Sequence, residues 1–99
     1  MAKRRITWLA GAKLELNNIL KYWKKANGSD SYSRKLLKLF KEEEVLILKF
    51  PYIGKKTNDP NVRQRIVRDY LLFYEITRTK IRILAVWDGR QDPKEKPIK

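Results

Sequence analysis

The chain has 99 residues and carries 24 basic against 11 acidic side chains, a formal net charge of +13. This length suits one small core rather than two, and an apolar content of 42% excludes a disordered chain. Because cysteine and histidine are both absent, we expect no disulfide, no metal site and no cofactor. The longest apolar run, 45–48, is too short to cross a bilayer, and we see no secretory signal. These features favour a cytoplasmic protein without a membrane partner.

The positive charge is spread along the whole chain. Residues 1–49 carry 12 basic and 5 acidic side chains, and residues 50–99 carry 12 and 6. The excess therefore belongs to the folded body and not to a detachable tail. It exceeds the roughly 2–8 units that suffice for solubility, which favours a polyanionic partner such as nucleic acid or a ribonucleoprotein.

The first third of the chain predicts a strand followed by a helix. Residues 3–8 alternate, with Ile6 and Trp8 on one side, which indicates a short strand. Residues 10–26 then show helical spacing and end at Asn27-Gly28, two residues that tolerate positive φ. The apolar stripe of this helix consists of Ala12, Leu16, Ile19, Leu20 and Trp23.

A second helix is expected from residue 30 to about residue 48, with Ser29 as its N-cap. Since only about three residues join the two helices, they must be antiparallel neighbours. Glu42, Glu43 and Glu44 suggest a carboxylate cluster, but consecutive helical residues point in different directions. We therefore interpret them as a solvated helix face.

Three strands are predicted after a loop over residues 49–61, with Lys55-Lys56 at its centre. The strands span 62–68, 70–77 and 80–87, and their short links make them an antiparallel meander. In the last of them, we expect the side chains of Ile81, Ile83, Ala85 and Trp87 on one face.

The order of elements is thus β-α-α-β-β-β, an α+β fold. It has a small, mainly antiparallel sheet with a helical hairpin packed on one face. We expect a single domain over residues 1–91 and a loose C-terminal tail over 92–99, which is polar and contains two prolines. The opposite face of the sheet is left open, and function is expected there.

Basic and aromatic side chains are expected on this open face. If Tyr70 and the alternate residues after it face the helices, Leu71 and Phe73 point away. If Val62 and Ile66 point inward, their neighbours Arg63 and Arg65 point outward. The predicted site is a basic hollow of Arg63, Arg65, Arg82 and Arg90, floored by Leu71 and Phe73, with Lys55, Lys56 and Arg68 as further nucleic-acid contacts.

The alternative for Arg63, Arg65 and Arg82 is the ordinary solvated face of amphipathic strands. Arg90 is harder to explain in this way because it follows a glycine turn. A large aromatic such as Phe73 on a wet face invites a stacked base or an apolar partner.

The segment from Val62 to Pro93 carries a recognisable pattern. Val-Arg precedes Asp-Tyr-x-Leu-Phe-Tyr-Glu-Ile, which is followed by Ile-x-Ile-Leu-Ala-Val-Trp-Asp-Gly-Arg-Gln-Asp-Pro. Together with Trp8-Leu9-Ala10-x-Ala12, Leu16-x-x-Ile19-x-x-Tyr22 and Pro51-x-x-Gly54, this pattern resembles the RelE/ParE superfamily of toxins from type II toxin–antitoxin modules. The resemblance covers nearly the whole chain.

The resemblance implies one of two targets. RelE-like members cut mRNA in the ribosomal A site, by attack of the ribose 2′-hydroxyl on the adjacent phosphate, whereas ParE-like members poison DNA gyrase. In the first case, Arg63, Arg65 and Arg90 match catalytic arginines. Leu71 stands where a further arginine belongs, and residues 92–99 lack the expected tyrosine.

Our leading expectation is a RelE-like, ribosome-dependent endoribonuclease that acts on mRNA. The alternatives are a ParE-like gyrase inhibitor without nuclease activity and a nucleic-acid-binding module without toxicity. Either toxin is expected to bind a cognate antitoxin, through an acidic and apolar segment laid over the helical hairpin or the open sheet face.

Overall fold

The computed structural model describes residues 3–99 and confirms the predicted α+β class and order of elements. It adds a short strand, β2, within the segment that was expected to be a loop. The elements are β1 (Arg5–Trp8), α1 (Ala10–Asn27), α2 (Ser31–Lys49), the 3₁₀ helix η1 (Pro51–Ile53), β2 (Lys55–Lys56), β3 (Val62–Val67), β4 (Tyr70–Ile76), β5 (Lys80–Asp88) and the 3₁₀ helix η2 (Pro93–Glu95).

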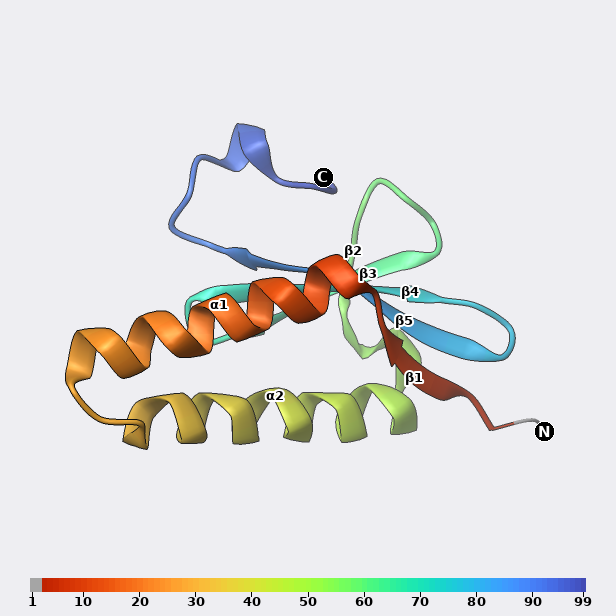
Figure 1. The fold of residues 1–99 in the computed structure, drawn as a ribbon. Helices are drawn as coiled ribbons and strands as arrows, with labels where there is room; N and C mark the ends of the chain where they lie inside the picture. Colours follow the sequence, from red (N-terminus) through yellow and green to blue (C-terminus); the bar gives the residue numbers. More distant parts are fainter. Residues whose placement is uncertain (1–2) are drawn as a thin grey trace.

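The five strands form one sheet in the order β1-β5-β4-β3-β2. The strands β2 to β5 are antiparallel to their neighbours, as the short links between them require. The N-terminal strand β1 instead pairs in parallel with β5, from Arg5 opposite Lys80 to Trp8 opposite Ile83. The sheet is therefore mainly antiparallel, and its first and last strands are neighbours (Figure 1).

The two helices pack as an antiparallel hairpin on one side of the sheet (Figure 1). Gly28 ends α1 in the left-handed conformation, with φ 66°, where a side chain would add strain. Leu36 and Phe40 of α2 are fully buried, as is Ala12 of α1, which allows close approach. This helix face of the sheet holds the larger of two hydrophobic clusters.

Polar side chains fasten the hairpin to itself and to the sheet. The Ser33 hydroxyl donates to the Leu20 carbonyl at 2.6 Å, and Trp23 Nε1 donates to the Tyr70 hydroxyl at 2.7 Å. Every buried side-chain nitrogen or oxygen among residues 3–99 has a hydrogen-bond partner. The loss of contact with water on burial of these polar groups is therefore compensated by hydrogen bonds within the protein.

A β-bulge in β5 changes which face its side chains reach. Tyr74 lies opposite Ile83, but Phe73 lies opposite Ala85, so Leu84 is an extra residue in the ladder. The expectation that Ile81, Ile83, Ala85 and Trp87 share a face is therefore wrong. The first two lie in the cluster under the helices, and the last two lie in the cluster on the opposite face.

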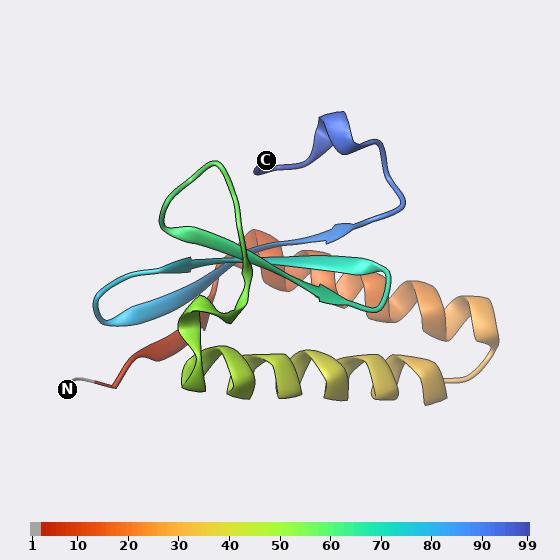
Figure 2. The same cartoon turned by 180° about the vertical axis from the view of Figure 1, so that it is seen from behind.

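The opposite face of the sheet carries the smaller cluster, made of Val62, Phe73, Ala85 and Trp87. Residues 92–99, expected to be a loose tail, fold back on this side and form η2. Ile98 packs against the cluster, and the backbone N–H of Asn58 donates to the Lys99 carbonyl at 3.1 Å. Figure 2 shows the tail and the loop between β2 and β3 on the same side of the sheet, away from the helices.

None of the helices within residues 3–99 has the length and apolar character that a membrane span requires.

Candidate functional site

The strand β3 faces the opposite way from the sequence prediction. Its tight turn to β4 places Val67 opposite Tyr70, and residues opposite one another in an antiparallel pair share a face. Arg65 lies opposite Leu72, and Leu72 is buried beneath the helices. The prediction that Arg63 and Arg65 point to the open face is therefore wrong, because the turn puts both on the helix face.

Arg65 is held by a carboxylate of α2. Its Nε and Nη2 donate to the two carboxylate oxygens of Glu43 at 2.9 and 3.0 Å. Both side chains are largely covered, and this bidentate hydrogen bonding raises the pKa of Arg65. The guanidinium thus joins β3 to α2.

The other two glutamates of the run differ from each other. Glu44 accepts a hydrogen bond from Trp8 Nε1 at 3.0 Å, which ties α2 to β1. Glu42 is exposed. The interpretation of residues 42–44 as a solvated face is thus wrong for Glu43 and Glu44, which are half-buried structural partners.

Arg63 is held by the segment after α2. Its Nη1 donates to the carbonyls of Tyr52 and Gly54, both at 3.1 Å, and its guanidinium lies 5.2 Å from the centre of the Tyr52 ring. The Tyr74 hydroxyl accepts from the Gly54 N–H at 3.0 Å and donates to the Pro51 carbonyl at 2.7 Å. A Cβ at Gly54 would lie 2.6 Å from that hydroxyl, so only glycine fits.

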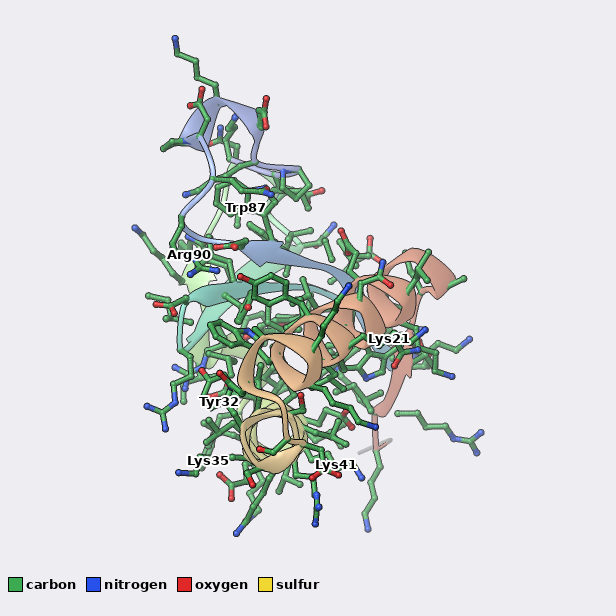
Figure 3. All side chains as sticks on the ribbon, turned by 60° about the vertical axis from the view of Figure 1, so that its left-hand side comes forward. Lys21, Tyr32, Lys35, Lys41, Trp87 and Arg90 are labelled. Atoms are coloured by element: carbon green, nitrogen blue, oxygen red, sulfur yellow. The ribbon has the colours of Figure 1, made fainter. Side chains whose placement is uncertain are left out.

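Arg90, which is labelled in Figure 3, pairs with its own turn. The strand pairing places it near the opposite end of the sheet from Arg63. Its Nε and Nη2 donate to the Asp88 carboxylate at 3.0 and 2.9 Å. These hydrogen bonds lower the pKa of Asp88 and raise that of Arg90. A groove of about 460 Å³ runs beside it between α1 and β5, and Tyr22 and Tyr70 help to line that groove.

The predicted nucleic-acid contacts also lie apart. Arg82 points to the open face and meets Glu75 across the strands at 3.4 Å. Lys55 and Lys56 form the exposed edge strand β2. Arg68 occupies the turn after β3 with φ 57°, a left-handed conformation that is uncommon for a residue with a side chain.

Phe73 points away from the helices, as expected, but it is not a platform for a base. It is 0% exposed, because Ala85, Trp87 and the C-terminal tail cover it. Figure 3 shows Trp87 on the side of the sheet where the tail lies. The predicted basic hollow floored by Leu71 and Phe73 is therefore not formed, since its guanidiniums lie on different surfaces and its aromatic floor is closed.

A different hollow occupies the open face, next to the tail. It has a volume of about 440 Å³, and Ile66, 71% exposed, is its most exposed apolar residue. Lys96 and Leu71 line both this hollow and an adjoining one of about 350 Å³ that reaches Arg68 and Arg90. We name the first the open-face hollow; its lining is Ile53, Lys55, Gln64, Arg65, Ile66, Leu71 and Lys96.

Large apolar side chains stay exposed from the end of α2 to this hollow. Sequence reasoning missed them because it assigned residues 49–61 to a loop and placed Ile66 in the core. The signal available was the run Phe50-Pro51-Tyr52-Ile53, which is apolar although it follows a helix end. The exposed members are Val45, Leu48, Phe50, Tyr52, Ile53 and Ile66.

These surfaces combine paired basic side chains with exposed apolar side chains. Arg63, Arg65 and Arg90 are each satisfied by oxygens of this chain, two of them by carboxylates. Within residues 3–99, no group of three Asp, Glu, His or Cys side chains could hold a metal ion. The open-face hollow offers apolar contact beside the ammonium groups of Lys55 and Lys96.

The helical hairpin, the five-stranded sheet and the sequence pattern define a toxin of the RelE/ParE superfamily, as the sequence analysis expected. Residues 6–93 match the family described as ParE toxin of type II toxin-antitoxin system, parDE, and the chain belongs to that family.

A solved structure, described as the chromosomal ParDE TA system from P. aeruginosa, is similar to this chain with a TM-score of 0.75 and 16% identity. The alignment covers 87% of this chain and 96% of the other, which supports the fold. A search of curated proteins gave no match.

Membership of the ParE family corrects our leading functional expectation. The RelE-like, ribosome-dependent cleavage of mRNA is wrong as the main interpretation, and the ParE-like alternative fits the match over residues 6–93. The endoribonuclease role suggested for Arg63, Arg65 and Arg90 falls with it. The structure is consistent with this correction because Arg63 and Arg65 are oriented by the body of the protein and not toward an open site.

Proposed function

We propose that the protein is a ParE-type toxin that inhibits DNA gyrase without cutting nucleic acid, and that a cognate antitoxin neutralises it. The observation that carries the proposal is the family match over residues 6–93. The sequence departures noted above agree with it, since Leu71 replaces a basic residue and residues 92–99 contain no tyrosine.

The surface that contacts gyrase is, in this proposal, the open-face hollow. Ile66 gives it an exposed apolar anchor, and the lysines around it favour an acidic protein surface. An anchor that stays exposed in the isolated chain is removed from water only when a partner covers it. Among the apolar residues that line this hollow, Ile66 therefore loses the largest exposed fraction when a partner covers it.

The proposal is tested with purified protein in two assays run side by side. We expect it to block supercoiling by gyrase on relaxed plasmid, while mRNA in a coupled translation reaction stays intact. Cuts in mRNA that depend on ribosomes, with unimpaired supercoiling, would contradict the gyrase proposal.

The surface assignment is tested with two variants matched in exposure. Ile66→Thr keeps a β-branched residue in β3 and should weaken gyrase inhibition about tenfold, in keeping with the loss of one buried apolar anchor. Leu14→Gln removes a 60% exposed leucine from α1 and should leave inhibition unchanged. Equal inhibition by Ile66→Thr and the parent protein would remove the open-face hollow from the proposal.

A further inference from the structure

The turn between β3 and β4 holds an arginine in a backbone conformation that arginine disfavours. Arg68 has φ 57°, and it is the one residue other than glycine within residues 3–99 that has a positive φ. In this left-handed region the Cβ of an L-residue crowds the following carbonyl oxygen, so glycine and asparagine are the residues usually found there. Arginine at this position therefore lowers the stability of the turn, and folding alone gives no reason for it.

The Arg68 side chain makes no polar contact that would offset this strain. It is exposed, and among residues 3–99 no hydrogen bond or ion pair holds its guanidinium. Arg63, Arg65 and Arg90 are instead each held by oxygens of this chain. Strained backbone is characteristic of functional sites, so a strained residue with a free guanidinium points to a ligand outside the chain.

Arg68 lies beside the exposed apolar anchor Ile66. The two residues line the same two hollows, one of about 350 Å³ that reaches the tail and one of about 360 Å³ between α2 and β3. Ile66 also lines the open-face hollow, so the three hollows adjoin at this side chain. A partner that covers Ile66 therefore comes within reach of the Arg68 guanidinium.

We propose that Arg68 binds a carboxylate of gyrase while Ile66 is buried against an apolar side chain of the same partner. This inference rests on the proposed function and adds to it a residue and the chemical group that the residue recognises. A guanidinium presents its N–H groups in a planar fork that matches the two oxygens of a carboxylate. Arginine is enriched at protein interfaces, where an apolar centre is buried beside it, whereas DNA interfaces are more polar. The neighbouring Ile66 thus favours a protein carboxylate over a DNA phosphate.

The test compares the same substitution in the two turns that flank β4. Arg68→Asn removes the guanidinium and introduces a residue that tolerates φ 57°, so this variant should be at least as stable in urea as the parent. Arg78→Asn is the matched control, because it removes the same charge from an exposed arginine in the turn between β4 and β5. Arg68→Lys keeps the charge but loses the planar fork.

Each purified protein is titrated into a supercoiling assay with gyrase and relaxed plasmid. Arg68→Asn should raise the half-inhibitory concentration about tenfold although its stability is not reduced. Arg68→Lys should raise it about threefold, and Arg78→Asn less than about twofold. A loss of inhibition without a loss of stability distinguishes binding from support of the fold, because a residue that only supported the turn would change both.

Equal inhibition by Arg68→Asn and the parent would overturn the assignment. Equal weakening by Arg68→Asn and Arg78→Asn would overturn it as well, since the effect would then follow net charge. So would an Arg68→Asn variant that unfolds at a lower urea concentration than the parent, or one that binds a fluorescent DNA duplex as much more weakly as it inhibits gyrase. These outcomes leave the proposed function standing, whereas a parent protein that does not inhibit gyrase would remove both together.

Discussion

The two faces of the sheet differ in how they are built and in what they leave exposed. On the helix face, thirteen buried residues from both helices and from the central strands form one core. On the open face, four buried residues are covered by an eight-residue tail that contributes Ile98. The helix face supplies most of the apolar burial that stabilises the fold, and the open face leaves apolar surface next to basic side chains. The main core and the exposed apolar surface of the open-face hollow thus lie on opposite sides of one sheet.

The largest effect is expected from a cavity in the helix face. Phe40 is fully buried between α2 and the sheet, so Phe40→Ala should lower the free energy of unfolding by about 3–5 kcal/mol. Urea denaturation followed by circular dichroism measures the loss. A loss below about 1 kcal/mol would show that this face is not the main core.

The next effect comes from a hydroxyl on the same face. Tyr74→Phe leaves the Gly54 N–H and the Pro51 carbonyl without their buried partner and should cost about 1–3 kcal/mol. Burial also raises the pKa of Tyr74 above its ordinary value of 10.0. The folded state then holds its proton more tightly than the unfolded state does, so stability is complete below pH 10 and falls as the pH rises further.

The pH dependence separates the two faces. Above pH 10, Tyr74→Phe should lose stability less steeply than the parent does, because one raised tyrosine pKa is gone. Ile98→Ala on the open face should lower the whole curve without changing its slope, since no tyrosine belongs to that cluster. Identical slopes for Tyr74→Phe and the parent would argue against the role given to this hydroxyl.

Ile98→Ala should itself lower the free energy of unfolding by about 1–2 kcal/mol. This is less than the loss typical of a fully buried isoleucine, because the Ile98 side chain is partly exposed. It should also raise the binding of an apolar dye, since Phe73 and Trp87 lose their cover. A variant with unchanged stability and dye binding would mean that the tail does not protect the open face in solution.

The last comparison is between one arginine on each face, and it includes the smallest expected effect. Arg65→Met removes the bidentate pair with the largely covered Glu43 and should cost about 1.5–3 kcal/mol at most. Arg82→Met removes a 3.4 Å pair with Glu75 at a more exposed position and should cost about 0.2–1 kcal/mol. Raising the salt concentration should reduce the second cost more than the first.

Much of the fold could be predicted because its signals are local. Helical spacing, the Gly28 stop and the short strand links predicted the hairpin, the meander and the inward side of β4. The side of the sheet to which each residue of β3 points could also have been predicted, because a tight turn at Arg68-Asp69 places Val67 opposite Tyr70. Assigning Val62 and Ile66 to the core by composition alone overrode that geometry.

The remaining errors have causes that a sequence pattern does not contain. The bulge at Leu84 shifts Ala85 and Trp87 to the other face, although the alternation of the strand looks unbroken. The cover over Phe73 depends on a distant contact with Ile98, a single apolar residue in a polar tail. Ile66 is exposed because β3 presents it to the open face. The candidate site in the structure is therefore the open-face hollow beside Ile66 and not the predicted arginine cluster.

The parallel pairing of β1 with β5 has a consequence for how the protein is made. β1 lies at the edge of the sheet, and its one strand neighbour is β5, which is synthesised after all the other strands of the sheet. A ribosome that stops before residue 80 releases a product in which the first strand has no place to dock and β4 lacks one side of its ladder. The sheet can therefore be completed only after β5 has been synthesised, and chains that end before residue 80 are expected to lack the native fold.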